Sequence, residues 1–284
     1  MLLIFWKHIQ NVQQGYRLTN SERHGISMEL TEVMFHLKCM EKDIGKYVLL
    51  PGDPGRTDVI AGYIDNARLI GSNREFRIWT GSLDGELVSI VSTGIGGPSA
   101  AIAIEELVMC GADTFIRIGT CGGMQSEVPA GQLVIPTGAV RMEGTSHEYM
   151  PSAFPAVPDF GLACAIVNAA KKLSIPYVSG VVHCKDSFYG QHSPDRMPVA
   201  NRLIDDWNAW IAAGVLASEM ESAALFVVAS VLNVRCASVL NMIWNQEREK
   251  KYGIECTPQL DMDAAVKTAV EALRSIIQED KLKK

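Results

Sequence analysis

Thr114-Phe-Ile-Arg-Ile-Gly-Thr-Cys-Gly-Gly123 is the stretch around which the rest of the chain is organised. Its first half, with Phe115 and two isoleucines, predicts a buried strand that then breaks into glycines. The backbone N–H groups of such glycines and the hydroxyl of Thr120 can bind an anion. Arg117 interrupts the apolar run, and a buried arginine needs an anionic partner because an unpaired buried charge is costly. Taken alone, the stretch has two equally good interpretations. It could form an anion site, or Arg117 could face solvent on a half-buried strand that ends in an ordinary glycine turn.

Composition narrows the class of protein. The chain has 284 residues, 48% of them hydrophobic and 20% charged, which is typical of a folded globular protein. The net charge is −6 and the basic residues form no stripe, so we expect no nucleic-acid partner. No apolar run approaches the length of a membrane span, so no membrane partner is expected. Seven scattered cysteines without a Cys-x-x-Cys pair indicate reduced thiols and a cytoplasmic protein, not a disulfide framework or a zinc knuckle.

The first residues differ from the remainder. Residues 1–27 are polar after a short apolar start, and Met28 begins a more regular sequence. We therefore expect an N-terminal extension over residues 1–27 that is not part of the core fold, and a single domain over residues 28–284. A short amphipathic helix over residues 4–12 is the alternative for the extension.

Strand and helix patterns alternate along the domain. The predicted strands are 47–50, 78–83, 87–91, 114–118, 132–136, 178–184 and 237–243. The predicted helices are 57–64, 100–110, 159–173, 202–213, 218–229 and 262–278. This alternation predicts an α/β fold in one layered domain. In the helix 202–213 we expect Trp207 and Trp210 to pack in the core.

Two more segments contain residues that could bind an anion or a sugar. Pro51-Gly-Asp-Pro-Gly-Arg56 follows a strand and opens a helix, where backbone N–H groups and the positive helix end can face a phosphate. The spacing of its glycines matches neither of the common nucleotide-binding motifs. A plain Gly-Asp-Pro turn with an exposed arginine is therefore an alternative to a phosphate site. Glu219 and Glu221 begin an apolar segment, and buried carboxylates need donors such as sugar hydroxyls. Their alternative role is to complement the helix dipole.

Several segments together resemble a known family. They lie in order from about Val33 to the last helix, and resemble the uridine phosphorylases of the trimeric or hexameric nucleoside phosphorylase family. The matching segments are 51–56 (Pro-Gly-Asp-Pro-Gly-Arg), 73–76 (Asn-Arg-Glu-Phe), 92–99 (Ser-Thr-Gly-Ile-Gly-Gly-Pro-Ser), 117–120 (Arg-Ile-Gly-Thr), 188–191 (Phe-Tyr-Gly-Gln) and 219–222 (Glu-Met-Glu-Ser).

The resemblance implies a fold and an activity. The fold is a three-layer sandwich with a mixed, partly barrel-like central sheet flanked by helices. The activity is reversible phosphorolysis of a pyrimidine nucleoside, uridine first, to free base and ribose 1-phosphate in nucleoside salvage. The enzyme is then a pentosyltransferase that needs no cofactor and no divalent metal, with phosphate as co-substrate. A homo-oligomer with shared sites, a hexamer built as a trimer of dimers, is also implied.

The resemblance also implies roles for single residues. Phosphate would be bound by Gly52, Arg56, Arg74, Arg117 and Thr120, with Arg74 reaching a neighbouring subunit's site. Ribose would be held by His36 from across a dimer interface, and by Met220 and Glu221. Phe188 would stack on the base and Gln191 would hydrogen-bond its edge. Glu75, Ile95 and Ser99 match positions that hold a monovalent cation, a structural potassium ion, between subunits.

The chemistry of the reaction agrees with these residue types. Breaking an N-glycosidic bond builds an oxocarbenium-like sugar and leaves negative charge on the base. Arginines would place the phosphate under the sugar as nucleophile and counter-charge. We expect Arg117 and Glu221 to be catalytic, mainly by positioning and electrostatics, because no strong general acid is evident.

The base end departs from the family. Ser193 stands where these enzymes often have an arginine, and a second base-side arginine falls on Ile243. We expect Arg196 and Asn241 to substitute as donors to the base. Asn245, Arg248 and His192 are further candidates.

Three other functions stay open. A purine nucleoside phosphorylase is disfavoured because no aspartate follows the late strand. A nucleoside hydrolase of the same fold would not need three arginines, Arg56, Arg74 and Arg117, for phosphate. A non-catalytic nucleoside sensor would be favoured if Arg117 or Glu221 were missing, and both are present.

Overall fold

The computed structural model describes residues 33–283. The predicted extension, residues 1–27, and the first residues of the predicted domain lie outside the described residues, so that boundary stays a prediction. Of the helices within residues 33–283, none has the length and apolar character needed to cross a membrane.

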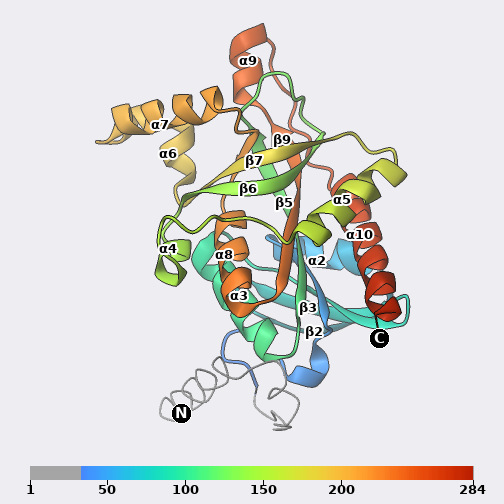
Figure 1. The fold of residues 1–284 in the computed structure, drawn as a ribbon. Coiled ribbons are helices and arrows are strands. Elements are labelled where there is room, and N and C mark those ends of the chain that lie inside the picture. Colours follow the sequence, from blue (N-terminus) through green and yellow to red (C-terminus); the bar gives the residue numbers. More distant parts are fainter. Residues whose placement is uncertain (1–32, 284) are drawn as a thin grey trace. The chain divides into compact units, whose positions relative to one another are not determined.

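One mixed sheet organises the described residues (Figure 1). In spatial order its strands are β2 (Asp65–Asn73), β3 (Phe76–Leu83), β4 (Glu86–Val91), β1 (Tyr47–Pro51), β5 (Thr114–Gly123), β8 (Ala217–Glu219), β7 (Tyr177–Lys185), β6 (Leu133–Met142) and β9 (Arg235–Trp244). Strand β5 also pairs with β9, so five strands, β5, β8, β7, β6 and β9, close into a ring. The predicted α/β fold with a mixed, partly barrel-like sheet is confirmed.

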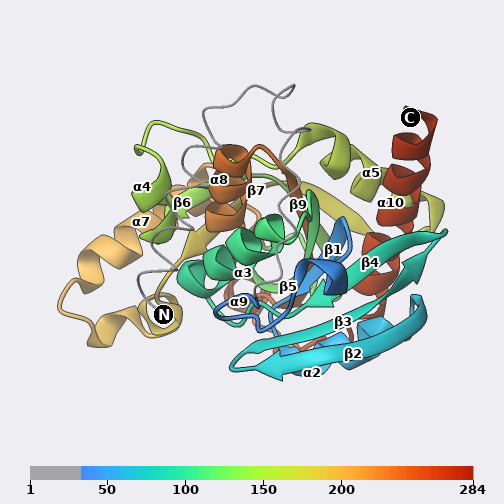
Figure 2. The same cartoon turned by 90° about the horizontal axis from the view of Figure 1, so that it is seen from below.

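Helices cover both faces of the sheet. The helices are α2 (Pro54–Ala61), α3 (Gly97–Met109), α4 (Thr145–Tyr149), α5 (Phe160–Lys172), α6 (Phe188–His192), α7 (Ala200–Ala212), α8 (Ser222–Leu232), α9 (Gln246–Tyr252) and α10 (Asp263–Leu282), with short 3₁₀ turns at Glu41–Asp43 and Pro194–Arg196. Figure 2 shows α3 beside α8 and α5 beside α10. Each pair packs on its own large apolar cluster, one on either side of the sheet. The three layers follow from this division.

Strand β5 lies at the centre of this arrangement. It is parallel to β1 and β9, with Arg117 opposite Leu50 and Ser238. The expectation that the strand breaks into glycines after Ile118 is wrong, because pairing with β9 continues to Gly122. The glycines serve close packing instead: a Cβ at Gly119 would lie 2.7 Å from the Arg117 guanidinium. Any larger residue there would displace that guanidinium.

Two helix predictions also need correction. Ser218 and Glu219 lie in the short strand β8, paired with β5 and β7, so the helix starts at Ser222 rather than at Ser218. In α7 no residue is buried, and Trp207 and Trp210 are only partly covered. Trp207 Nε1 donates to Glu247 Oε1 at 3.0 Å. The predicted core packing of the two tryptophans is therefore wrong, because α7 lies outside the main clusters.

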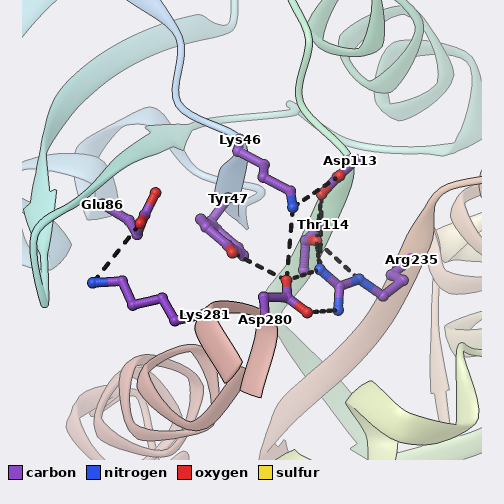
Figure 3. Close-up of polar contacts among 8 residues, drawn as sticks. All are labelled: Lys46, Tyr47, Glu86, Asp113, Thr114, Arg235, Asp280 and Lys281. Atoms are coloured by element: carbon purple, nitrogen blue, oxygen red, sulfur yellow. Dashed lines mark hydrogen bonds and ion pairs between the residues drawn. The ribbon is translucent and has the colours of Figure 1, made fainter. Parts of the chain in front are cut away.

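A polar network fixes the last helix to the amino ends of three strands (Figure 3). Asp280 of α10 accepts from Tyr47 Oη at 3.0 Å and from Arg235 Nη1 at 3.0 Å. Arg235 Nη2 also donates to Thr114 Oγ1 at 2.6 Å. The hydrogen bond from Arg235 lowers the pKa of Asp280, so the pair stays ionised. β1, β5 and β9 are thereby held together at the end opposite their carboxyl termini.

Candidate active site

A cavity of about 720 Å³ opens at the carboxyl ends of β1, β5 and β9. Open α/β sheets commonly bind ligands at this position. Its walls include nine of the predicted site residues: Gly52, Arg56, Glu75, Ile95, Arg117, Thr120, Phe188, Met220 and Glu221. Segments that are far apart in sequence therefore meet in one chamber.

Arg117 is the best-fixed side chain of the cavity. It is 4% exposed, its Nε donates to Glu219 Oε2 at 3.2 Å, and its Nη2 donates to Glu221 Oε2. Within residues 33–283 its Nη1 is buried and has no hydrogen-bond partner. That nitrogen lies 3.9 Å from the position that a Cβ at Gly52 would occupy. A buried donor without a partner is costly, and an anion beside Gly52 would remove that cost.

Arg56 brings a second positive charge to the same wall. It belongs to the first turn of α2, whose N-cap Asp53 accepts from Gly55 N–H at 2.9 Å. Burial lowers the pKa of Arg56, the charge of Asp53 opposes this, and the charge of Arg117 adds to it. The two guanidinium groups therefore repel each other electrostatically, and an anion between them would relieve that repulsion.

Glu221 is held from two sides. Its Oε1 accepts from Gly96 N–H at 2.6 Å and its Oε2 accepts from Arg117. Burial raises the pKa of Glu221, and the charge of Arg117 lowers it. Each carboxylate oxygen has a further lone pair, so the group can still accept from hydroxyls in the cavity. Met220 lies next to it in the cavity wall.

The base end contains a residue that sequence reasoning missed. Lys185 is 7% exposed, lines the cavity, and donates from Nζ to Ser218 Oγ at 2.7 Å. Burial lowers the pKa of Lys185, and the charge of Glu219 opposes that shift. The sequence did contain a pattern that could have identified Lys185: a lysine stands at the end of a strand pattern and directly precedes a loop of polar and aromatic residues. Lys185 offers a cationic donor to the cavity that Ile243 also lines.

Phe188 and Gln191 lie at the same end of the cavity. Phe188 is half exposed, and its ring centroid is 4.3 Å from that of His192, which also lines the cavity. Gln191 lines an adjoining cavity of about 600 Å³, and its Oε1 accepts from Ser218 Oγ at 2.8 Å. The Phe188 ring and the Gln191 amide thus lie on two adjoining cavities that share Lys185 and His192 in their lining.

Of the candidate substitute donors, His192 lines the cavity, whereas Arg196, Asn241, Asn245 and Arg248 do not. Arg196 lies over the ring of Tyr189, with 5.0 Å between Cζ and the centroid. Asn241 donates to the carbonyls of Gln259 and Asp261, and Asn245 caps α9 and donates to Gln125 and Val128. Arg248 donates to Ser126 O. Neither Arg196 nor Asn241 lines the cavity, and the Asn241 amide is engaged by two backbone carbonyls. That these two residues read the base stays a prediction.

His36 and Arg74 lie close together but outside the cavity of their own chain. Asn73 Nδ2 donates to His36 O at 2.6 Å, and His36 Nδ1 is 2.6 Å from Glu106 Oε1. Arg74 sits in the turn between β2 and β3 with a φ of 55°. Glu75, the next residue, accepts from Ser99 Oγ at 2.7 Å, which lowers its pKa.

Comparisons with known proteins agree with this geometry. The model of the Phosphorylase superfamily matches residues 46–278. A uridine phosphorylase of Treponema pallidum (strain Nichols) is 51% identical, over 88% of this chain and 96% of that protein. A uridine phosphorylase of Thermococcus kodakarensis is 42% identical, over 75% and 79%. A guanosine phosphorylase of Halorubrum lacusprofundi is 35% identical, over 85% and 98%.

The cavity gathers two arginines and two buried glutamates, a lining that suits a small polar molecule. The chain belongs to the Phosphorylase superfamily.

Proposed function

We propose that this protein is a uridine phosphorylase, a pentosyltransferase of nucleoside salvage that cleaves uridine with phosphate. The observation that carries the proposal is the buried, unpartnered Nη1 of Arg117 beside Gly52, with Arg56 on the same wall. A hydrolase of this fold would need no such anion site. The relatives named as uridine phosphorylases support the choice of base.

The residues divide the reaction between them. Arg117, Arg56, Thr120 and the Gly52 backbone hold phosphate, and Glu221 and Met220 hold the ribose. A phosphate oxygen forms the new bond to C1′ while the bond from C1′ to the base nitrogen breaks. The base leaves with the bonding electron pair and afterwards takes a proton from solvent. Fixed donors such as Lys185 Nζ stabilise the charge that develops on the base.

Base choice is the part of the proposal that a substrate panel tests. One relative is a guanosine phosphorylase, so the family fold alone does not fix the base. With phosphate supplied, we expect uridine to be cleaved with a kcat/KM at least about 100-fold above that of guanosine or inosine, the discrimination that unmatched buried polar groups produce. Ultraviolet absorbance follows each release. A purine nucleoside cleaved as fast as uridine would contradict the assignment.

We also propose that sites are shared in a homo-oligomer, with Arg74 and His36 completing a neighbour's cavity. The two residues lie close together and neither lines the cavity of its own chain, which supports this role. Two variants test it: Arg74→Ala and Glu221→Ala should each be inactive, whereas mixing them under conditions that exchange subunits should restore up to about a quarter of wild-type activity. The fraction follows because a complete site needs a wild-type Glu221 from its own subunit and a wild-type Arg74 from the neighbouring subunit. In an equal mixture of the two variants, one in four pairs of neighbouring subunits meets both conditions. Mixtures that stay inactive although mass photometry shows exchange would refute the shared site.

Two further points belong to the proposal. A hard cation such as potassium prefers oxygen ligands, which Glu75, Ser99 and the Ile95 segment could supply between subunits. Replacing potassium by tetramethylammonium and measuring the oligomer mass tests this. The seven cysteines are free, which supports a reducing cytoplasm, and cell fractionation tests that location.

A further inference from the structure

Ser218 is the junction of three polar side chains at the base end of the cavity. Its Oγ accepts from Lys185 Nζ at 2.7 Å, donates to Gln191 Oε1 at 2.8 Å and lies 2.9 Å from His183 Nδ1. Ser218 lines the 720 Å³ cavity, while His183 and Gln191 line the adjoining one. His183 and Ser218 are both buried and face each other on the paired strands β7 and β8. The chain His183–Ser218–Gln191 therefore runs from the sheet to the base position.

With Gln191 Oε1 turned towards Ser218, as in this structure, hydrogen-bond capacity fixes the remaining directions among these side chains. A serine hydroxyl has one hydrogen to donate and two lone pairs that accept. The lysine ammonium can only donate, so Lys185 occupies one lone pair. The hydroxyl hydrogen goes to Gln191 Oε1. The second lone pair is all that remains, so His183 must donate from Nδ1.

The neutral form of His183 can meet this demand. Burial and the neighbouring charge of Lys185 lower its pKa to about 4, and the charge of Glu219 acts the other way. At neutral pH the ring therefore carries one hydrogen, which can reside on Nδ1. The tautomer of His183 is then a structural variable of the site.

The orientation of Gln191 follows from that tautomer. With Oε1 engaged by Ser218, the amide nitrogen Nε2 is the end left for a ligand. It lies 4.0 Å from the position that a Cβ at Gly122 would take, and Gly122 lines the cavity. Lys185 Nζ and Gln191 Nε2 together give this wall N–H donors.

The reversed arrangement would present the opposite group. If His183 carried its hydrogen on Nε2, the bare Nδ1 would accept the serine hydrogen. Gln191 would then have to flip and donate to Ser218, turning Oε1 towards the cavity. Two satisfied arrangements exist, and the histidine tautomer and the amide orientation change together.

We propose that His183 is a positioning residue for base recognition: by donating to Ser218 it holds the NH₂ group of Gln191 towards the base. Gln191 then reads a carbonyl oxygen of the pyrimidine rather than its ring N–H. This inference rests on the proposed function and concerns the same site. Negative charge on a departing pyrimidine gathers on its carbonyl oxygens, so the same donors favour its departure.

The test compares uridine with 3-methyluridine, in which a methyl group replaces the hydrogen of the ring N–H and both carbonyl oxygens are kept. The measured quantity is the ratio of kcat/KM for uridine to that for 3-methyluridine, so that general damage cancels. Ser218→Ala and His183→Leu release the amide, which can then accept the ring N–H of uridine alone. We expect both variants to raise the ratio about tenfold, the worth of one hydrogen bond. His183→Asn keeps an N–H near the Nδ1 position and should keep the wild-type ratio.

Ser238→Ala is the matched control, because this buried serine bonds to Ser222 and lies outside the chain His183–Ser218–Gln191. It should leave the ratio unchanged. Solid-state nitrogen NMR of histidine-labelled wild-type protein gives an independent reading, with His183 identified as the signal missing from His183→Asn. A hydrogen on Nδ1 is expected. A bare Nδ1, or an unchanged ratio in both Ser218→Ala and His183→Leu, would overturn the proposal. Absence of phosphorolysis by the wild type would refute the proposed function instead, and the NMR reading would still decide the tautomer.

Discussion

Replacing Arg117 with lysine should lower kcat/KM for phosphate by about two to three orders of magnitude, the loss typical of removing one fixed donor to a developing charge. The guanidinium donates to Glu219 and Glu221, and among the described residues its Nη1 has no partner, which leaves that nitrogen for the proposed phosphate. A lysine has one nitrogen and cannot serve all three directions in the same plane. It keeps the positive charge, so the two buried glutamates stay compensated and the protein should remain folded.

Steady-state kinetics with phosphate as the varied substrate checks this expectation. Arg77→Lys is the matched control, because Arg77 pairs with Asp58 at 2.8 Å and does not line the cavity. It should leave kcat/KM unchanged. Arg117→Ala is the wrong variant for this purpose, since leaving buried charges without their partner typically costs about 3–5 kcal/mol of stability. Wild-type phosphate kinetics in a folded Arg117→Lys enzyme would remove Arg117 from the phosphate site.

Replacing Glu221 with glutamine should lower kcat/KM for uridine by about 100-fold or more, since hydrogen bonds to charged groups contribute about 1.5–3 kcal/mol each. The new NH₂ group must face either the Gly96 N–H or the Arg117 guanidinium, and both are donors. The carboxylate that would accept the ribose hydroxyls is also lost. The penalty should shrink for 2′,3′-dideoxyuridine, which lacks those hydroxyls.

Parallel kinetics with the two nucleosides measures this difference. Glu105→Gln provides the control, because Glu105 accepts from Tyr149 Oη at 2.9 Å and does not line the cavity. An equal penalty for uridine and the dideoxy nucleoside would show that Glu221 does not hold the sugar hydroxyls.

The meeting of Gly52, Arg56 and Arg117 in one cavity could be predicted from the sequence, because its determinants are local. Arg117 lies on a strand that apolar residues mark clearly, and Arg56 follows a glycine turn that opens a helix. The ends of parallel strands meet at one edge of a sheet, so strand order alone brings both residues together. Even here the sequence misjudged the glycines: β5 continues through them by pairing with β9, and at Gly119 and Gly123 a neighbouring side chain occupies the space that a Cβ would need.

The base side could not be predicted in the same way. Lys185 and Ser218 act through a contact between β7 and β8, and nothing near either residue in the sequence marks that pairing. Asn241 looked like a donor because it lies on a late strand, yet its amide serves two backbone carbonyls of the segment before α10. Polar residues at the end of a strand were recognisable, but the partner that each one meets depends on the tertiary fold.

The most direct test of phosphorolysis is the release of uracil from uridine with and without phosphate. The phosphate site built around Arg117 predicts that release needs phosphate and that ribose 1-phosphate forms in equal amount to uracil. Release at the same rate without phosphate, with free ribose as the product, would identify a hydrolase and contradict the proposed function.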